Sequence, residues 1–132
     1  MTHDLSETHR VAYRSFGTPL RHVRVTPDVV RAIDGIRWRL NGTCAGDKSE
    51  MWFADLRAPA TRRARTICEA CPVRTACLAA ALLYGEEYGI WGGVDPDERL
   101  VLDRRLRLGE SLRSVVRSVI ARRTVGELDE AV

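Results

Sequence analysis

The chain has 132 residues and a formal net charge of +3, which is the size of one small domain with a limited hydrophobic core. No apolar run approaches the roughly 18 residues that a membrane-spanning helix needs, and the first residues lack the basic-then-apolar order of an export signal. We therefore expect a cytoplasmic protein, in a compartment where disulfides are rare and a group of cysteines indicates a cofactor.

The N-terminal part of the chain is predicted to be a flexible arm over residues 1–25, because it is polar and shows no period. All three histidines lie in it, and we expect them to be exposed to solvent rather than bound to a metal: His3, His9 and His22. A helix is predicted next, since Thr26 is a suitable N-cap, Pro27 suits the first helical position, and apolar residues follow at helical spacing to about Leu40. Residues 41–57 are expected to form a loop.

Four further helices are predicted, over residues 58–67, 73–84, 95–108 and from residue 112 onward. Pro72 can start the second of these and Gly85 can end it. Asp95 and Glu98 have the spacing of a capping box at the start of the third. The last contains an apolar stripe at helical spacing: Leu112, Val115, Val116, Val119 and Ile120. No stretch alternates with a period of two, so we expect an all-α fold of about four to five short helices.

The four cysteines of the chain lie within one stretch, and none is left over: Cys44, Cys68, Cys71 and Cys77. A CxxC pair, a third cysteine after five residues and one distant partner are more typical of an iron–sulfur centre than of a zinc site. Pro72 places Cys71 just before a helix, where it can turn toward Cys77 on that helix. We therefore expect the four thiolates to hold one [4Fe–4S] cluster around which the helices are organised.

Two other uses of the cysteines remain open at this point. A four-cysteine zinc-binding interaction module usually pairs two short-spaced cysteine knuckles, and this chain has only one CxxC. A thiol–disulfide oxidoreductase would use Cys68 and Cys71, but its CxxC normally follows a strand, and no strand is predicted before Cys68. The chain also lacks a phosphate-binding glycine loop, an HExxH motif and a nucleophile elbow. We therefore expect no enzyme activity, no catalytic residues and no small-molecule substrate.

Three glycines surround a tryptophan in the stretch Gly89-Ile90-Trp91-Gly92-Gly93. Glycine loses much conformational freedom on folding, so there must be a reason to fix this backbone. Two interpretations fit the pattern: a tight turn in which Trp91 covers the core, or a rigid turn that presents Trp91 to a partner.

Several motifs follow one another along residues 38–108: Cys44, the 68/71/77 cysteine spacing, Cys-Pro-Val-Arg-x-x-Cys-Leu, and Gly-Ile-Trp-Gly-Gly followed by Asp-Glu-Arg. In this combination and order they resemble the WhiB-like (Wbl) family of actinobacterial regulators. The resemblance implies a [4Fe–4S] cluster on the four cysteines, no catalytic turnover, and docking onto the C-terminal region of the principal sigma factor of RNA polymerase. It divides the chain into the arm (1–25), a Wbl-type iron–sulfur domain (26–94) and an Arg-rich C-terminal helical segment (95–132).

The resemblance also implies which residues face the sigma factor. By position these are four aromatic residues: Trp38, Trp52, Phe53 and Trp91. Exposed aromatic residues gathered around one centre are typical of an interface hot spot. The chain departs from the family by having Trp52 where phenylalanine is common, and by a longer N-terminal arm and a longer C-terminal helix.

The C-terminal segment is basic, with eight arginines and two acidic residues between residues 99 and 123. A basic helical face suits contact with phosphates, and in Wbl proteins the region after the Gly-Trp turn contacts DNA. Five arginines are therefore expected to contact promoter DNA: Arg104, Arg105, Arg107, Arg113 and Arg117. Together these features predict a cluster-dependent transcription regulator that binds the sigma factor and promoter DNA, and whose cluster reports redox state or nitric oxide.

Overall fold

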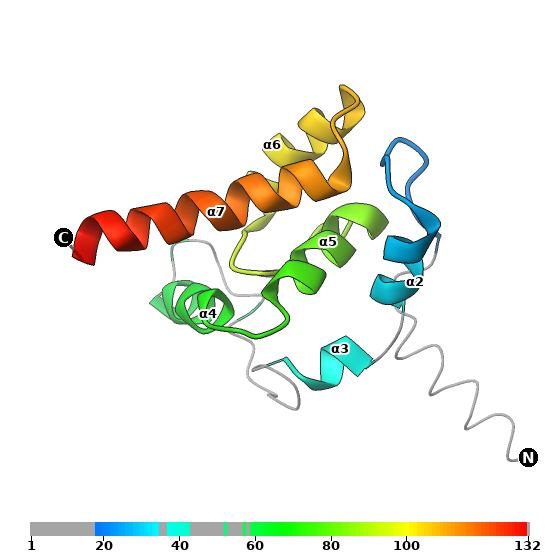
Figure 1. Ribbon diagram of the computed structural model, residues 1–132. Coiled ribbons are helices and arrows are strands. Elements are labelled where there is room, and N and C mark those ends of the chain that lie inside the picture. Colours follow the sequence, from blue (N-terminus) through cyan, green and yellow to red (C-terminus); the bar gives the residue numbers. More distant parts are fainter. Residues whose placement is uncertain (1–17, 35–36, 43–51, 53–56, 58, 132) are drawn as a thin grey trace, which may run out of the picture.

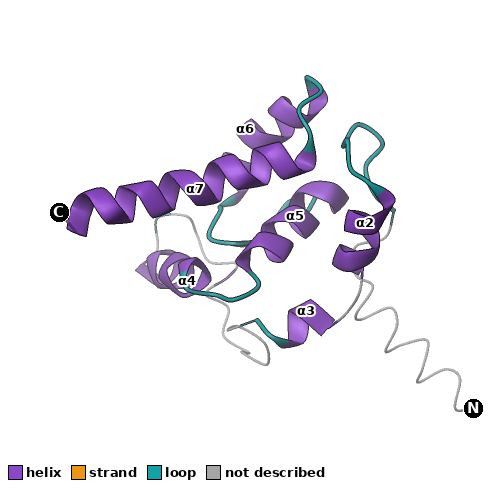
Figure 2. Ribbon diagram, viewed as in Figure 1, coloured by secondary structure: helices purple, strands orange, loops and turns teal. Residues whose placement is uncertain are grey.

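The computed structural model describes residues 18–34, 37–42, 52, 57 and 59–131 (Figure 1). The regular structure within these residues is helical, and none of them forms a strand (Figure 2). The helices are α2 (Pro27–Asp34), α3 (Arg37–Leu40), α4 (Pro59–Glu69), α5 (Arg74–Tyr84), α6 (Pro96–Arg107) and α7 (Leu112–Ala131). The expected all-α fold is therefore confirmed for the described part of the chain.

Helix α5 lies at the centre of the fold and is buried along most of its length (Figure 1). Its sequence is apolar on all sides, which is typical of a helix with neighbours on several faces. It packs against α2, α6 and α7, and its fully buried side chains include Leu78 and Leu83. The main hydrophobic core lies where these four helices meet.

Local signals fix the ends of the central helices. Gly85 follows α5 with a left-handed φ of 69°, and its N–H donates to the carbonyl of Ala81. Asp95 caps α6: its carboxylate accepts from the Glu98 N–H at 2.7 Å, and the Glu98 carboxylate accepts from the Asp95 N–H at 3.1 Å. The capping box is therefore present where the sequence predicts it.

The first predicted helix is two helices in the structure, α2 and α3, and residues 35–36 between them lie outside the described residues. The predicted start is confirmed, because Pro27 begins α2 and the Thr26 hydroxyl accepts from the Val29 N–H at 3.4 Å. The indole N–H of Trp38 donates to the carbonyl of Ile33 at 2.6 Å and so joins α3 to the last turn of α2.

Residues 18–25, which we expected to belong to a flexible arm, pack onto the core. Val23 is only 7% exposed, and Leu20 packs against the same core. The Leu20 N–H donates to the carbonyl of Leu83 on α5 at 2.8 Å. The segment is held in place because its few apolar side chains bury surface against α5. The overall polarity of residues 1–25 does not reveal these few apolar positions.

Polar contacts also tie this segment to the C-terminal half of the chain. His22 is half-buried, and its Nε2 lies 2.7 Å from a carboxylate oxygen of Asp103 on α6. It is therefore not the solvent-exposed histidine that we expected. The carbonyl of Arg24 accepts from the N–H of Leu112, the first residue of α7, at 3.0 Å.

Helix α7 carries the predicted apolar stripe across α5 (Figure 1). Gly109, with a φ of 104°, separates it from α6. Leu112, Val115 and Val116 are buried, and Val119 and Ile120 pack against the same core.

No single helix in the described ranges is long and apolar enough to cross a membrane; α4 and α5 pass that test only as a pair bent by 116° at the break between them.

Candidate metal centre

Three of the predicted cluster ligands come from the junction of α4 and α5. Cys68 lies in the last turn of α4, Cys71 in the elbow that follows, and Cys77 in the first turn of α5. The elbow is tight because the Cys71 N–H donates to the Cys68 carbonyl at 3.1 Å, and the Arg74 N–H donates to the Cys71 carbonyl at 3.2 Å. These successive turns bring residues of two helices to one place.

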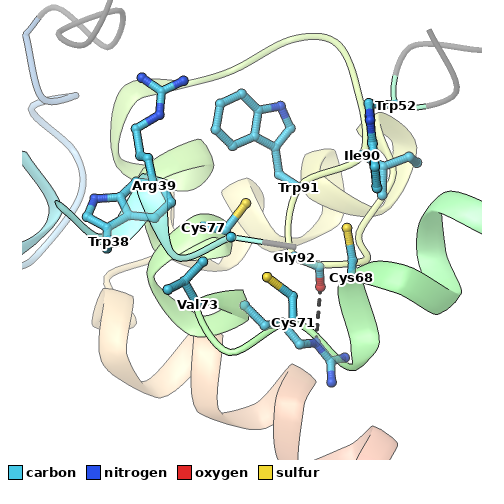
Figure 3. Close-up of a pocket in the computed structure, with 12 residues that line it drawn as sticks. Trp38, Arg39, Trp52, Cys68, Cys71, Val73, Cys77, Ile90, Trp91 and Gly92 are labelled. Carbon is cyan, nitrogen blue, oxygen red and sulfur yellow. Dashed lines mark hydrogen bonds between the residues drawn. The ribbon is translucent and has the colours of Figure 1, made fainter. Parts of the chain in front are cut away.

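The three cysteines line one cavity of ≈ 190 Å³ (Figure 3). Its walls are mostly apolar, and they include three tryptophans, from α3, from residue 52 and from the glycine-rich turn: Trp38, Trp52 and Trp91. Cys68 is buried, whereas Cys71 and Cys77 are half-buried. The structure therefore brings together three of the four predicted ligands, and the fourth, Cys44, lies outside the described residues.

The chemistry of this donor set fits an iron–sulfur cluster. A [4Fe–4S] cluster is held by four cysteine thiolates, each on a different iron, so its ligands do not need to converge on one point. A zinc ion instead needs all of its cysteine sulfurs about 2.3 Å from a single centre. Where the chain is described, no three or more His, Cys, Asp or Glu side chains form a group that could hold one metal ion.

A buried hydrogen-bond donor also belongs to this cavity. The indole Nε1 of Trp52 is buried and has no hydrogen-bond partner among the described residues, and Trp52 lines the cavity. A buried N–H without an acceptor costs about 1–3 kcal/mol. A sulfide or thiolate sulfur would supply the missing acceptor, so this indole supports a sulfur-rich, anionic occupant.

Two arginines that the sequence prediction did not include also line the cavity: Arg39 from α3 and Arg74 from α5. Arg74 is buried, and its Nε–H donates to the carbonyl of Gly92 at 3.2 Å (Figure 3). The positive charge of these two arginines would stabilise an anionic group in the cavity. The signal that could have found Arg74 is its place in the sequence, midway between Cys71 and Cys77.

The glycine-rich turn, residues 89–93, forms another wall of the cavity. Trp91 and Val94 exchange two backbone hydrogen bonds, of 3.1 and 3.0 Å. The glycines have left-handed φ angles, 83° at Gly89, 58° at Gly92 and 80° at Gly93. A Cβ on Gly92 would lie 2.8 Å from both the Arg74 carbonyl oxygen and the Leu78 Cβ, so only glycine allows the turn to pack this closely on α5. The predicted tight turn is therefore present.

Comparison with known proteins points to one family. A family model described as "Transcription factor WhiB" matches residues 38–102. The chain is also 42% identical over 77 residues to the redox-responsive transcriptional regulator WhiB3 of Mycolicibacterium smegmatis, a match that covers 53% of this chain and 80% of that relative. The chain belongs to the WhiB family.

Two further WhiB relatives show the same similarity. The transcriptional regulator WhiB1 of Mycobacterium tuberculosis is 39% identical over 72 residues, which cover 52% of this chain and 86% of the relative. The transcriptional regulator WhiB2 of Mycolicibacterium smegmatis is 39% identical over 82 residues, which cover 62% and 60%. The region matched by the family model contains the cysteines, the cavity and the turn, whereas residues 18–26 and helix α7 lie outside it.

The glycine-rich turn is held from its other side by Arg99, a residue that the sequence prediction counted only as one of the eight arginines between residues 99 and 123. Arg99 lies on α6, and the residue is only 4% exposed. Its guanidinium donates five hydrogen bonds to backbone carbonyls on or beside the turn. Burial lowers the pKa of this guanidinium, and the negative charge of Asp95 and Cys77 opposes that shift. Arg99 is therefore an internal charge rather than part of a DNA-facing surface.

Three of the four aromatic residues predicted to face a partner lie in the described part of the chain, and these three do not form one exposed patch. Trp52 is only 8% exposed, because it packs against Ala64, Cys68 and Ile90 in a second small core. Trp38 and Trp91 are half-buried and pack partly against the main core, and Phe53 lies outside the described residues. The indole N–H of Trp91 donates to the carbonyl of Tyr88 at 2.9 Å, which fixes the ring relative to the turn.

The five arginines predicted to contact DNA differ in how available they are. Arg104, Arg113 and Arg117 are exposed. Arg105 is half-buried and donates to the Glu110 carboxylate at 2.9 and 2.6 Å, and to Ser118 at 3.0 Å. Arg107 is exposed, but it donates to Asp103 at 2.7 Å. Two of the five therefore already have acidic partners within the fold.

Proposed function

We propose that this protein is a cytoplasmic, iron–sulfur-dependent transcription regulator without catalytic turnover. The observation that carries the proposal is that the three described cysteines line one apolar cavity. One wall of this cavity is the glycine-rich turn, residues 89–93, called the Trp91 turn below. A cavity built in this way joins the proposed cofactor directly to the proposed docking surface. Membership of the WhiB family, whose matched relatives are named transcriptional regulators, supports this role.

Four cysteines would hold a [4Fe–4S] cluster in this cavity: Cys44, Cys68, Cys71 and Cys77. When bound, the cluster would supply a redox-active and nitric-oxide-reactive centre. The thiolates would fix the end of α4 and the start of α5, while Arg74 and Arg39 would supply positive charge beside them. The Trp52 indole N–H would donate a hydrogen bond to a sulfur, which would give this buried donor the acceptor that it lacks.

The surface beside the cavity is the proposed contact with the C-terminal region of the principal sigma factor. Trp91 and Trp38 lie there, and both residues are only half-buried. Partly exposed tryptophans over a rigid base are typical of residues that dominate interface energies. Trp52 would act indirectly, by supporting the turn, because the Trp52 carbonyl accepts a hydrogen bond from the Ile90 N–H at 2.7 Å. Phe53 is proposed by its position in the sequence.

Promoter DNA is the proposed partner of the arginines on α6 and α7. Arg104, Arg113 and Arg117 are exposed and would be the main phosphate contacts. Arg105 and Arg107 would contribute less, because Glu110 and Asp103 neutralise part of their charge.

The test is to co-express the full chain anaerobically with the C-terminal domain of the principal sigma factor and to analyse the purified complex. We expect brown protein with about four iron and four sulfide per chain, in a complex with the sigma domain. Colourless protein with stoichiometric zinc would instead favour a zinc-binding module. Metal-free protein that reduces a disulfide substrate through Cys68 would favour an oxidoreductase.

A response to nitric oxide or oxygen is the proposed regulatory step. Without a cluster to join them, Cys68 and Cys77 would no longer hold the end of α4 to α5, and the wall that the turn shares with the cavity would loosen. We expect nitric oxide to change the visible spectrum and to weaken sigma binding together. A changed spectrum with unchanged sigma binding would separate the cluster from the docking surface and contradict this step.

A further inference from the structure

The guanidinium of Arg99 binds four separate backbone carbonyls around the Trp91 turn. Nη1 donates to Gly89 at 2.7 Å and to Val94 at 2.8 Å. Nη2 donates to Tyr88 at 3.1 Å and to Glu86 at 3.2 Å, and Nε also donates to Glu86 at 3.3 Å. One side chain therefore satisfies carbonyls that precede and follow the tryptophan.

Two of these carbonyls have a second donor, since that of Val94 accepts from the Trp91 N–H and that of Tyr88 from the Trp91 indole N–H, so Arg99 is the donor that all four share. The three left-handed glycines reverse the chain between Gly89 and Val94, and Trp91 and Val94 exchange two backbone hydrogen bonds across this reversal. Buried carbonyls without donors are costly, so nearly all of them find a partner in folded proteins. The planar guanidinium, with five N–H donors in a fixed geometry, can serve several at once, which a lysine ammonium on a flexible stem cannot do.

The turn is also held from the cysteine side. The Arg74 Nε–H donates to Gly92, and the close approach of Gly92 to Leu78 seats the turn on the first turns of α5. Arg74 therefore ties the turn to the helix that bears Cys77, and Arg99 ties it to α6. The Trp91 turn lies between these two anchors.

We propose that Arg99 is a positioning residue that locks the Trp91 turn to α6, so that the orientation of Trp91 and the direction of α6 are fixed together. This inference rests on the proposed sigma contact for its functional meaning. If Trp91 docks onto the sigma factor, α6 and its exposed Arg104 are held at one fixed angle to that partner. Sigma docking would then set where the basic helices meet DNA, through a buried arginine that touches neither partner.

The test compares amide hydrogen exchange in the cluster-loaded wild-type protein, in Arg99→Lys, and in Arg63→Lys, a matched change at an exposed arginine of α4. In Arg99→Lys we expect exchange of the amides at residues 90–94 to rise about tenfold or more, while the amides at 78–84 of α5 stay within about twofold of wild type. Arg63→Lys should leave both segments unchanged. Unchanged exchange at 90–94, or an equal rise in both segments, would overturn the proposal, because the second result is what a general loss of stability produces.

Sigma binding is the second measurement on the same proteins. We expect Arg99→Lys to bind the sigma domain at least about tenfold more weakly with its iron content unchanged, as lost positioning of an anchor residue should do. If the wild-type protein does not bind the sigma domain, the proposed function fails, while the exchange data still decide whether Arg99 locks the turn.

A measurement on the unmodified protein covers the case in which Arg99→Lys does not fold. Five hydrogen bonds should give the Arg99 guanidinium resolved, slowly exchanging N–H signals in nitrogen-15 NMR spectra. Averaged and rapidly exchanging signals from Arg99 would overturn the proposal.

Discussion

The Nε–H of Arg74 donates to the carbonyl oxygen of Gly92 at 3.2 Å, and this contact joins the cysteine-bearing end of α5 to the middle of the tryptophan turn. The contact is possible because Gly92 has no side chain: a Cβ there would lie 2.8 Å from the carbonyl oxygen of the same Arg74. The cavity and the proposed docking surface thus share one wall.

The first prediction concerns this close approach. We expect Gly92→Ala to lower the free energy of unfolding by about 2 kcal/mol or more, because it combines a left-handed φ with a backbone clash. Gly109→Ala is the matched control, since its φ is also positive at 104° but a Cβ there meets nothing within 4 Å. It should lose only about 1 kcal/mol. Equal losses in urea unfolding would show that the clash with α5 is relieved without cost.

The second prediction separates the two roles of Asp95, which caps α6 and also forms an ion pair with Arg65 on α4. Asp95→Ala loses both and should cost about 1–3 kcal/mol of unfolding free energy. Asp95→Ser keeps a capping oxygen and should recover part of that loss. If the serine variant is no more stable than the alanine variant, the ion pair rather than the cap carries the contribution.

Asp95 also predicts a pH dependence of stability. Burial would raise the pKa of this carboxyl, but hydrogen bonds from Glu98 and the charge of Arg65 outweigh it, so the pKa lies below its ordinary value. The carboxyl therefore binds protons more readily in the unfolded chain, and its contribution is complete above about pH 4 and is lost as pH falls below that. Urea unfolding between pH 3 and 6 should show a smaller decline in Asp95→Ser than in wild type.

The third prediction concerns the buried indole N–H of Trp52. Trp52→Phe keeps an aromatic ring but removes the donor, so the metal-free protein should lose little stability, whereas a cluster should have a more negative reduction potential. Trp38→Phe is the contrast, because its N–H already donates to Ile33, and its loss should cost about 1 kcal/mol with or without metal. An unchanged potential in Trp52→Phe would mean that the indole N–H does not reach a sulfur.

The fourth prediction concerns the ligand that the sequence assigns at residue 44. Cys44→Ser should lower iron content and abolish capture of the sigma domain, because one thiolate of four is lost. Iron analysis and a pull-down under anaerobic conditions measure both. A variant that keeps full iron and full binding would remove residue 44 from the site.

The fifth prediction ranks the basic residues by their partners. Arg104→Ala should weaken promoter binding and reduce the slope of log K against log salt by about 0.9, as expected for one lost phosphate contact. Arg107→Ala should change the slope less, because its guanidinium already donates to Asp103. Equal effects would show that this ion pair opens when DNA binds.

Much of the helical pattern could be read from the sequence because the signals are local. Thr26-Pro27 and the Asp95 capping box fix helix starts through neighbouring residues, and Gly85 fixes an end in the same way. The apolar stripe that begins at Leu112 could also be predicted, since its spacing alone indicates a helix with one buried face.

What the sequence did not reveal depends on distant partners. Arg99 looks like any other residue of a basic stretch until the fold places four carbonyls around it. His22 pairs with a carboxylate 81 positions away, and Trp52 is covered by residues of α4 and the turn. None of these contacts leaves a periodic pattern, so averaging charge or polarity along a window hides them.

The packing of residues 18–26 has a consequence for how this protein can be shortened. The stretch shared with the family model begins only at residue 38 and ends at residue 102. In a fragment cut at those limits, α5 would lose its contact with Leu20 on one side and all of α7 on another. We expect the leucines exposed on α5 to cause self-association. We therefore expect residues 38–102 not to fold on their own, and chimaeras that exchange segments with a relative should keep both flanks.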